Sequence, residues 1–128
     1  MNLNAERRKS RGFTLVELMS VIVVLGILAG IATLSYGSWR RSIAQKEVAA
    51  EASSLQSTLK NYRNFNSTYP SNLDNLYTPG KNVTVNYRPS VDNYYCAIIT
   101  SQPYPDDFKS YITSDSTDIK NGGTCPLR

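Results

Sequence analysis

The chain of 128 residues contains no histidine and only two cysteines. Without histidine, the Ser-His-Asp and Cys-His arrangements of nucleophilic catalysis are excluded, as are histidine-rich metal sites. Two cysteines alone make a poor zinc site. No other nucleophile stands beside a suitable base, so we expect a protein that is not an enzyme and that needs no cofactor or metal.

Charge is missing from Leu18 to Trp39, a run of 22 residues. At about 1.5 Å per residue, a helix of this length spans a hydrocarbon core of roughly 30 Å. Residues 1–12 hold four basic and one acidic side chain, which leaves ten basic and nine acidic side chains for the rest. The basic start favours a cytoplasmic N-terminus. Because residues 13–128 are nearly neutral, the basic charge of the whole chain gives only weak evidence that this part binds nucleic acid.

Proline is absent from Phe13 to Tyr69. After the uncharged run, apolar residues recur at steps of three and four, which is one face of a helix. These residues are Ala44, Val48, Ala52, Leu55, Leu59 and Tyr62. We predict one helix of about fifty residues, apolar over 13–36 and amphipathic over 37–65, which Tyr69-Pro70 terminates.

The remaining residues predict a small antiparallel sheet. Alternating runs at 83–88, 94–100 and 108–113 indicate three strands. Turns are expected at 89–93 and 102–107, a short helical turn at 71–76 opened by a capping box, and a loop from 119 to 128. The predicted fold class is α+β, with the apolar face of the sheet covering the stripe at Leu55, Leu59 and Tyr62.

The junction between the basic and apolar stretches carries a specific motif. It resembles the prepilin processing motif of type IV pilins and pseudopilins, and reads Gly12-Phe13-Thr14-Leu15-Val16-Glu17-Leu18-Met19. The resemblance covers residues 7–36 well, and it implies that a prepilin peptidase cuts after Gly12 and methylates the new amine of Phe13. The alternative is a secretory signal peptide cut after Ala32, which follows a weak small-x-small site.

Glu17 is a carboxylate inside the apolar segment, where a charge costs about 2.5–3.5 kcal/mol on insertion scales. The N-terminal amine that cleavage creates at Phe13 of a neighbouring subunit is one candidate partner. The pilin resemblance implies this same pairing, which would set the axial register between subunits. The alternative is a side chain at the interface that reaches water.

Several further features allow two interpretations. Many type IV pilins carry proline where this chain has Leu34, so this helix cannot kink there by losing a donor. Gly26 and Gly30 either loosen the helix or allow close packing in a membrane. Nine tyrosines either pack the sheet or form an adhesive or DNA-stacking surface, and packing is the favoured interpretation. The loop acids at 106, 107, 115 and 118 match no calcium motif.

Cys96 and Cys125 would enclose a loop of 28 residues. If this region lies outside the cytoplasm, a disulfide is the default expectation. Chain entropy makes such a bridge worth roughly 3–4 kcal/mol. It also resembles the disulfide-closed C-terminal region of many pilins. The alternative is two free thiols.

We therefore expect a leader at 1–12, a transmembrane and filament-core helix at 13–36, and an extracytoplasmic head at 37–128. The hypothesis is a structural subunit of a type IV pilus-like filament for adhesion, twitching motility or DNA uptake. Its precursor would cross the cytoplasmic (inner) membrane once and then join an extracellular pilus. Partners would be other pilin subunits, the peptidase and inner-membrane assembly machinery. The alternatives are a type II secretion pseudopilin, and a minor or competence pilin whose head binds DNA or a surface.

Overall fold

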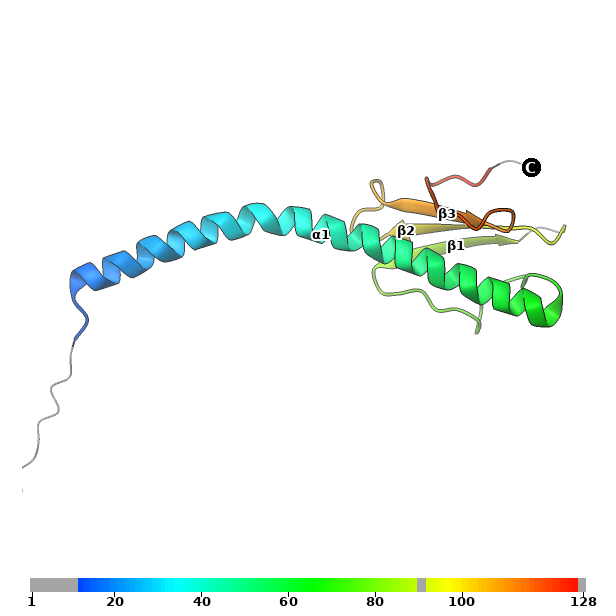
Figure 1. Ribbon diagram of the computed structural model, residues 1–128, viewed down its shortest axis with the longest axis horizontal. Helices are drawn as coiled ribbons and strands as arrows, with labels where there is room; N and C mark the ends of the chain where they lie inside the picture. Colours follow the sequence, from blue (N-terminus) through cyan, green and yellow to red (C-terminus); the bar gives the residue numbers. More distant parts are fainter. Residues whose placement is uncertain (1–11, 90–91, 127–128) are drawn as a thin grey trace, which may run out of the picture. The chain divides into compact units, whose positions relative to one another are not determined.

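The computed structural model describes residues 12–89 and 92–126. The chain divides into two units, with the boundary between Gly37 and Ser38. One helix, α1, Leu15–Asn66, has 52 residues and begins in the first unit and ends in the second (Figure 1). The predicted long helix is thus confirmed, whereas residues 1–11 of the predicted leader, 1–12, lie outside the described residues.

Helix α1 ends where the backbone turns left-handed. Ser67 has a φ of 60°, and its N–H donates a hydrogen bond of 2.8 Å to the Arg63 carbonyl. This five-to-one bond is the αL termination motif of helices. The helix therefore stops three residues before Tyr69-Pro70, close to the predicted end.

Four strands form an antiparallel sheet in sequential order (Figure 1). They are β1 Val83–Pro89, β2 Tyr95–Ser101, β3 Lys109–Thr113 and β4 Lys120–Asn121. The three predicted strands are confirmed. The prediction of a loop from 119 onward is wrong for β4, because a pair of two residues is too short to show any alternation in sequence.

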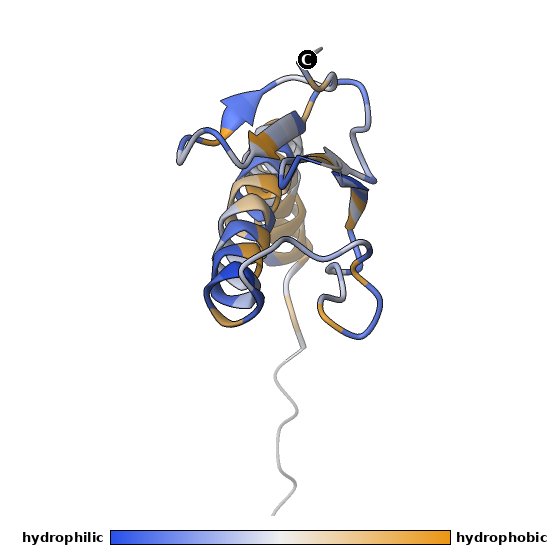
Figure 2. Ribbon diagram, turned by 90° about the vertical axis from the view of Figure 1, so that its right-hand side faces the viewer, coloured by the Kyte–Doolittle hydropathy of each residue, from blue (hydrophilic) through white to orange (hydrophobic). Residues whose placement is uncertain are grey.

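The core of the second unit lies between α1 and the inner face of the sheet (Figure 2). Leu55 and Leu59 are fully buried against β2, and Tyr62 is half-buried, so the predicted stripe is confirmed. Within the strands, the buried members of this core are Val83, Tyr95, Ala97, Ile99 and Ile112. Helix α1 and strand β2 supply most of the core, so the helix and the sheet bury one shared set of apolar side chains.

The predicted helical turn at 71–76 is wrong. Residues 74–76 form a turn in which the N–H groups of Leu76 and Tyr77 both donate to the Leu73 carbonyl. Asn75 has a φ of 60°, which a right-handed helix cannot contain. The long-range packing of Leu73 and Tyr77 against the core outweighs the local capping signal.

Candidate assembly site at the helix N-terminus

The start of α1 lies directly after the predicted processing junction. Gly12, Phe13 and Thr14 precede the helix, which begins at Leu15. Both Gly12 and Phe13 are exposed, Phe13 by 78%. The Gly12–Phe13 bond is therefore non-helical and open to solvent, as a peptidase substrate must be.

Thr14 and Glu17 cap this helix end reciprocally. The Glu17 N–H donates to Thr14 Oγ1 at 3.2 Å, and the Thr14 N–H donates to Glu17 Oε2 at 3.5 Å. This is a capping box, which satisfies two backbone donors that the first helical turn leaves over. The capping role of Thr14 was not predicted from the sequence, although the Thr-x-x-Glu spacing carries the signal.

Glu17 is exposed, and its local hydrogen bonds are long. Its Oε2 accepts from the Thr14 N–H at 3.5 Å and from Thr14 Oγ1 at 3.4 Å, against an ordinary length of about 2.9 Å. The partial positive charge of a helix N-terminus favours a carboxylate here by about 0.3–1 kcal/mol. The carboxylate is thus held at the helix start and remains accessible to a stronger donor from another chain.

The surface of the first unit is apolar and uncovered. Every residue from 12 to 42 is exposed, and Leu34 is 84% exposed. Its hydroxyl groups bond inward, since Ser20 Oγ donates to the Glu17 carbonyl at 2.8 Å and Thr33 Oγ1 donates to the Gly30 carbonyl at 2.9 Å. Helix α1 is long and apolar enough to cross a membrane. Lipid or other apolar chains must cover such a surface.

Helix α1 continues without interruption through Leu34 and through its three glycines. A Cβ built at Gly26, Gly30 or Gly37 meets no atom of the described chain within 4 Å, beyond the helix and its immediate neighbours. Close packing against another part of the described chain therefore does not require glycine at these three positions. The interpretation that they allow close helix packing requires a second molecule.

The predicted disulfide is confirmed. Cys96 on β2 is bonded to Cys125, with their Cα atoms 6.0 Å apart. Cys96 is buried, on the strand face opposite to Tyr95 and Ala97. The bond fastens the C-terminal segment to β2, one of the two inner strands of the sheet, and a covalent link of this kind adds stability to a domain with a small core.

Helix α1 also anchors the segment between its end and β1. Tyr77 Oη donates to Glu51 Oε1 at 2.7 Å, and the Gly80 N–H donates to the same oxygen at 3.0 Å. Burial, with a smaller contribution from this bond to Glu51, raises the pKa of Tyr77 to about 12. One carboxylate oxygen thus ties two points of the segment to the helix.

Tyrosines fill the other end of the sheet, which confirms the packing interpretation for this group. The rings of Tyr69 and Tyr95 meet edge to face with centroids 4.6 Å apart, and Tyr87 Oη donates to the Pro70 carbonyl at 2.8 Å. Burial raises the pKa of Tyr87 to about 12 and that of Tyr95 well above its usual range. These hydroxyl groups are therefore neutral packing elements at physiological pH.

The loop acids at the β2–β3 connection pair with basic side chains. Arg41 donates to Asp107 at 2.9 Å, and its guanidinium lies 5.7 Å from the ring centres of both Tyr104 and Phe108. Among residues 12–89 and 92–126, no group of three or more His, Cys, Asp or Glu side chains could hold a metal ion. Arg41 instead joins this loop to α1.

Comparison with known proteins agrees with this geometry. Residues 7–33 match the model of the prokaryotic N-terminal methylation motif. The type II secretion system core protein G of Vibrio cholerae serotype O1 is 30% identical over 116 residues, which cover 88% of this chain and 77% of that protein. The same-named protein of Pectobacterium carotovorum is 30% identical over 105 residues, which cover 79% of this chain and 66% of that protein.

A further relative with this name, from Klebsiella michiganensis, is 36% identical over 70 residues, which cover 55% of this chain and 49% of that protein. The exposed apolar helix segment and the small α+β head, together with the matched motif, define a pilin-like filament subunit. The chain belongs to the type IV pilin-like family that includes type II secretion system core protein G.

Proposed function

We propose that this chain is a structural subunit of a secretion-type pseudopilus, assembled from a membrane-anchored precursor. The observation that carries the proposal is the start of an exposed apolar helix directly after an open Gly12–Phe13 bond. The relatives' name, type II secretion system core protein G, favours a secretion filament over a surface fibre for adhesion, twitching motility or DNA uptake.

Processing after Gly12 is supported by the local backbone. The bond that follows Gly12 precedes the helix, whereas the bond after Ala32 lies within α1, where the backbone is hydrogen-bonded. A peptidase would have to unwind the helix to reach the second bond. Cleavage after Gly12 keeps the apolar helix on the product, and methylation would then fall on the amine of Phe13.

Glu17 is the proposed register residue. Its exposed carboxylate lies four residues after Phe13, and the amine of Phe13 exists only after cleavage. A salt bridge between that amine on one subunit and Glu17 on the next would neutralise both charges in an apolar filament core. Unprocessed precursor has no such amine, so assembly would depend on the cut.

The proposed organisation follows from these two roles. Residues 1–12 are the removed leader, 13–36 cross the inner membrane and later form the filament core, and 37–128 form the head outside the cytoplasm. The disulfide suits an oxidising compartment, which supports this orientation of the head. Other pilin-like subunits, a prepilin peptidase and inner-membrane assembly machinery are the proposed partners.

Mass spectrometry of the mature N-terminus tests the proposal. We expect the mature chain to begin at methylated Phe13, and Gly12→Leu to leave uncut precursor. A mature chain that begins at Thr33 would refute the proposal.

Deletion of the gene tests the destination of the filament. A secretion filament predicts loss of exoprotein export, with the subunit retained in the membrane fraction. Normal export together with abundant subunit in the fraction sheared from cells would instead identify a surface fibre.

A further inference from the structure

Phe65 is an aromatic side chain of the second unit that lies outside the core and is almost fully exposed. Phe65, in the last turn of α1, is 89% exposed, compared with 59% for Trp39 and 36% for Ile119. Burial of an aromatic side chain removes about 150–250 Å² from water, so an exposed one is a strong candidate for a contact with another molecule. Its exposure means that this Phe contributes little to the stability of its own head.

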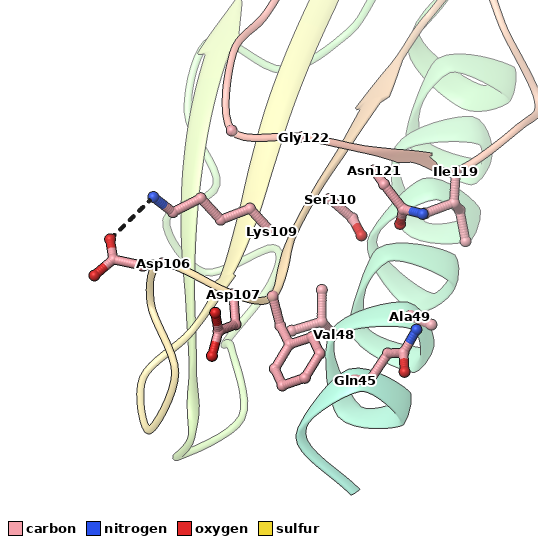
Figure 3. Close-up of a pocket in the computed structure, with 12 residues that line it drawn as sticks. Gln45, Val48, Ala49, Asp106, Asp107, Lys109, Ser110, Ile119, Asn121 and Gly122 are labelled. Carbon is pink, nitrogen blue, oxygen red and sulfur yellow. Dashed lines mark ion pairs between the residues drawn. The ribbon is translucent and has the colours of Figure 1, made fainter. Parts of the chain in front are cut away.

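The same unit contains a pocket of about 490 Å³ that can receive such a side chain. Val48 and Ala49 of α1 form one wall, and Phe108 and Ile119 supply further apolar surface. Figure 3 shows the α1 side chains and the β2–β3 loop around one opening, with Asp106 at its rim. The pocket thus combines apolar walls, an aromatic ring for edge-to-face contact and a polar rim, as protein-binding pockets do.

The side chain and the pocket lie far apart along α1, because Phe65 follows the pocket residue Val48 by 17 residues, or about 26 Å of helix. Arg41 pairs with Asp107, which places the pocket beside the first turns of α1 in this unit. Phe65 lies at the other end of α1, one residue before its last residue, Asn66. Because the two features are this far apart on one continuous helix, Phe65 cannot fill the pocket of its own chain.

Charge favours the same pairing. Residues 52–66 of α1 carry Lys60 and Arg63 and no acidic side chain. At the pocket rim the most exposed charge is negative, since the Asp106 side chain is 98% exposed and Lys109, which lies 3.7 Å from it, is 35% exposed. Asp107 is already paired with Arg41, but the Asp106 carboxylate is exposed enough to attract this basic helix end and to disfavour negatively charged partners.

We propose that Phe65 of one subunit inserts into the pocket at Val48, Ala49 and Phe108 of another copy of this chain. This inference rests on the proposed filament function, because the contact is heterologous and extends without closing when the copies are parallel. The 17 residues from Val48 to Phe65 correspond to a shift of about 26 Å along α1 between the two heads.

Cysteine cross-linking in filaments of the full chain tests the contact. The variant Ala49→Cys with Phe65→Cys, made alongside the peptidase and assembly machinery, is oxidised mildly and separated without reductant. We expect a ladder of multimers at least tenfold stronger than from either single variant. The matched control is Ala49→Cys with Asn64→Cys, which moves the thiol by about 100° around the same helix turn.

Each outcome decides the proposal. An equally strong ladder from the control pair, cross-links that stop at dimers, or cross-links to a different protein would overturn it. Sedimenting filaments without a ladder would overturn the Phe65 contact and leave the filament function standing. Absence of filaments from the unmodified chain would refute both.

A second variant separates this contact from processing. We expect Phe65→Ala to reduce sedimenting polymer at least tenfold while cleavage after Gly12 stays complete, and Phe65→Tyr to restore most of it. Because Phe65 is exposed, neither substitution disturbs the fold of the head. Normal polymer from Phe65→Ala would also overturn the contact.

Discussion

The Glu51 carboxylate should be the strongest single polar contribution to the stability of the head. Its Oε1 accepts hydrogen bonds from Tyr77 Oη at 2.7 Å and from the Gly80 N–H at 3.0 Å. Hydrogen bonds to a charged acceptor contribute about 1.5–3 kcal/mol each when shielded, and less where solvent competes. Gly80 is exposed and Tyr77 half-buried, so we expect Glu51→Ala to lower the free energy of unfolding by about 2 kcal/mol.

The assay is urea unfolding of the full chain in detergent micelles, followed by near-ultraviolet circular dichroism of the tyrosines. Glu51→Gln keeps an uncharged acceptor, so we expect it to lower the free energy of unfolding by about half as much as Glu51→Ala does. Tyr77→Phe should lower the free energy of unfolding by about 1 kcal/mol. A double-mutant cycle between Glu51 and Tyr77 should give a coupling of about 1 kcal/mol.

The matched control is Glu47→Ala, which removes the same charge one helical turn earlier. Glu47 accepts only long bonds from Asn82 Nδ2, at 3.4 and 3.5 Å, so we expect a loss below about 0.5 kcal/mol. Equal losses from the two alanine variants would show that helix charge, and not the anchoring of the segment, determines the effect. That result would refute the reasoning.

Three further predictions concern the tyrosines, Glu17 and the disulfide. The pKa values of Tyr77 and Tyr87 are raised to about 12 from 10 in the folded chain, so their contribution to the free energy of unfolding should be complete below pH 10 and should fall from pH 10 to 12. Absorbance at 295 nm and unfolding midpoints measured across this range check the expectation, and midpoints that do not change with pH would contradict it. Glu17→Ala should be cut normally yet yield at least tenfold less sedimenting polymer; normal polymer would exclude the register role. Cys96→Ser with Cys125→Ser should lower the free energy of unfolding by roughly 3–4 kcal/mol in denaturant titrations, and a loss below about 1 kcal/mol would indicate that packing alone holds the C-terminal segment.

Features that depend on local pattern could be predicted from the sequence. The helix, its apolar and amphipathic halves and three strands follow from periodicity, because hydrophobic repeats of 3.6 and 2 residues directly reflect burial. The faces of β2 could not be assigned, since Tyr94, Cys96 and Ile98 are as apolar as Tyr95, Ala97 and Ile99. Only packing against α1 selects the second set.

Features that depend on contacts between distant segments could not be predicted. The local signal at 71–76 favoured a helix, but the bonds of Tyr77 and Gly80 to Glu51 span 26 and 29 residues and impose a turn. The pocket brings together residues near 48, 108 and 119, which no local pattern associates. Sequence separation, and not any weakness of the motifs, limited these predictions.

Glu17 shows how one carboxylate can serve two stages of the proposed pathway. In a single chain it caps its own helix through Thr14, and the bonds that its carboxylate accepts, at 3.4 and 3.5 Å, are long for a charged acceptor. Such bonds hold the side chain at the helix start without satisfying it fully. An ammonium group on a neighbouring subunit would make a shorter and stronger bond in an apolar environment. In the proposed pathway the cap would keep the carboxylate in place until cleavage of another copy supplied the partner, and the order of processing and assembly would then depend on this one side chain.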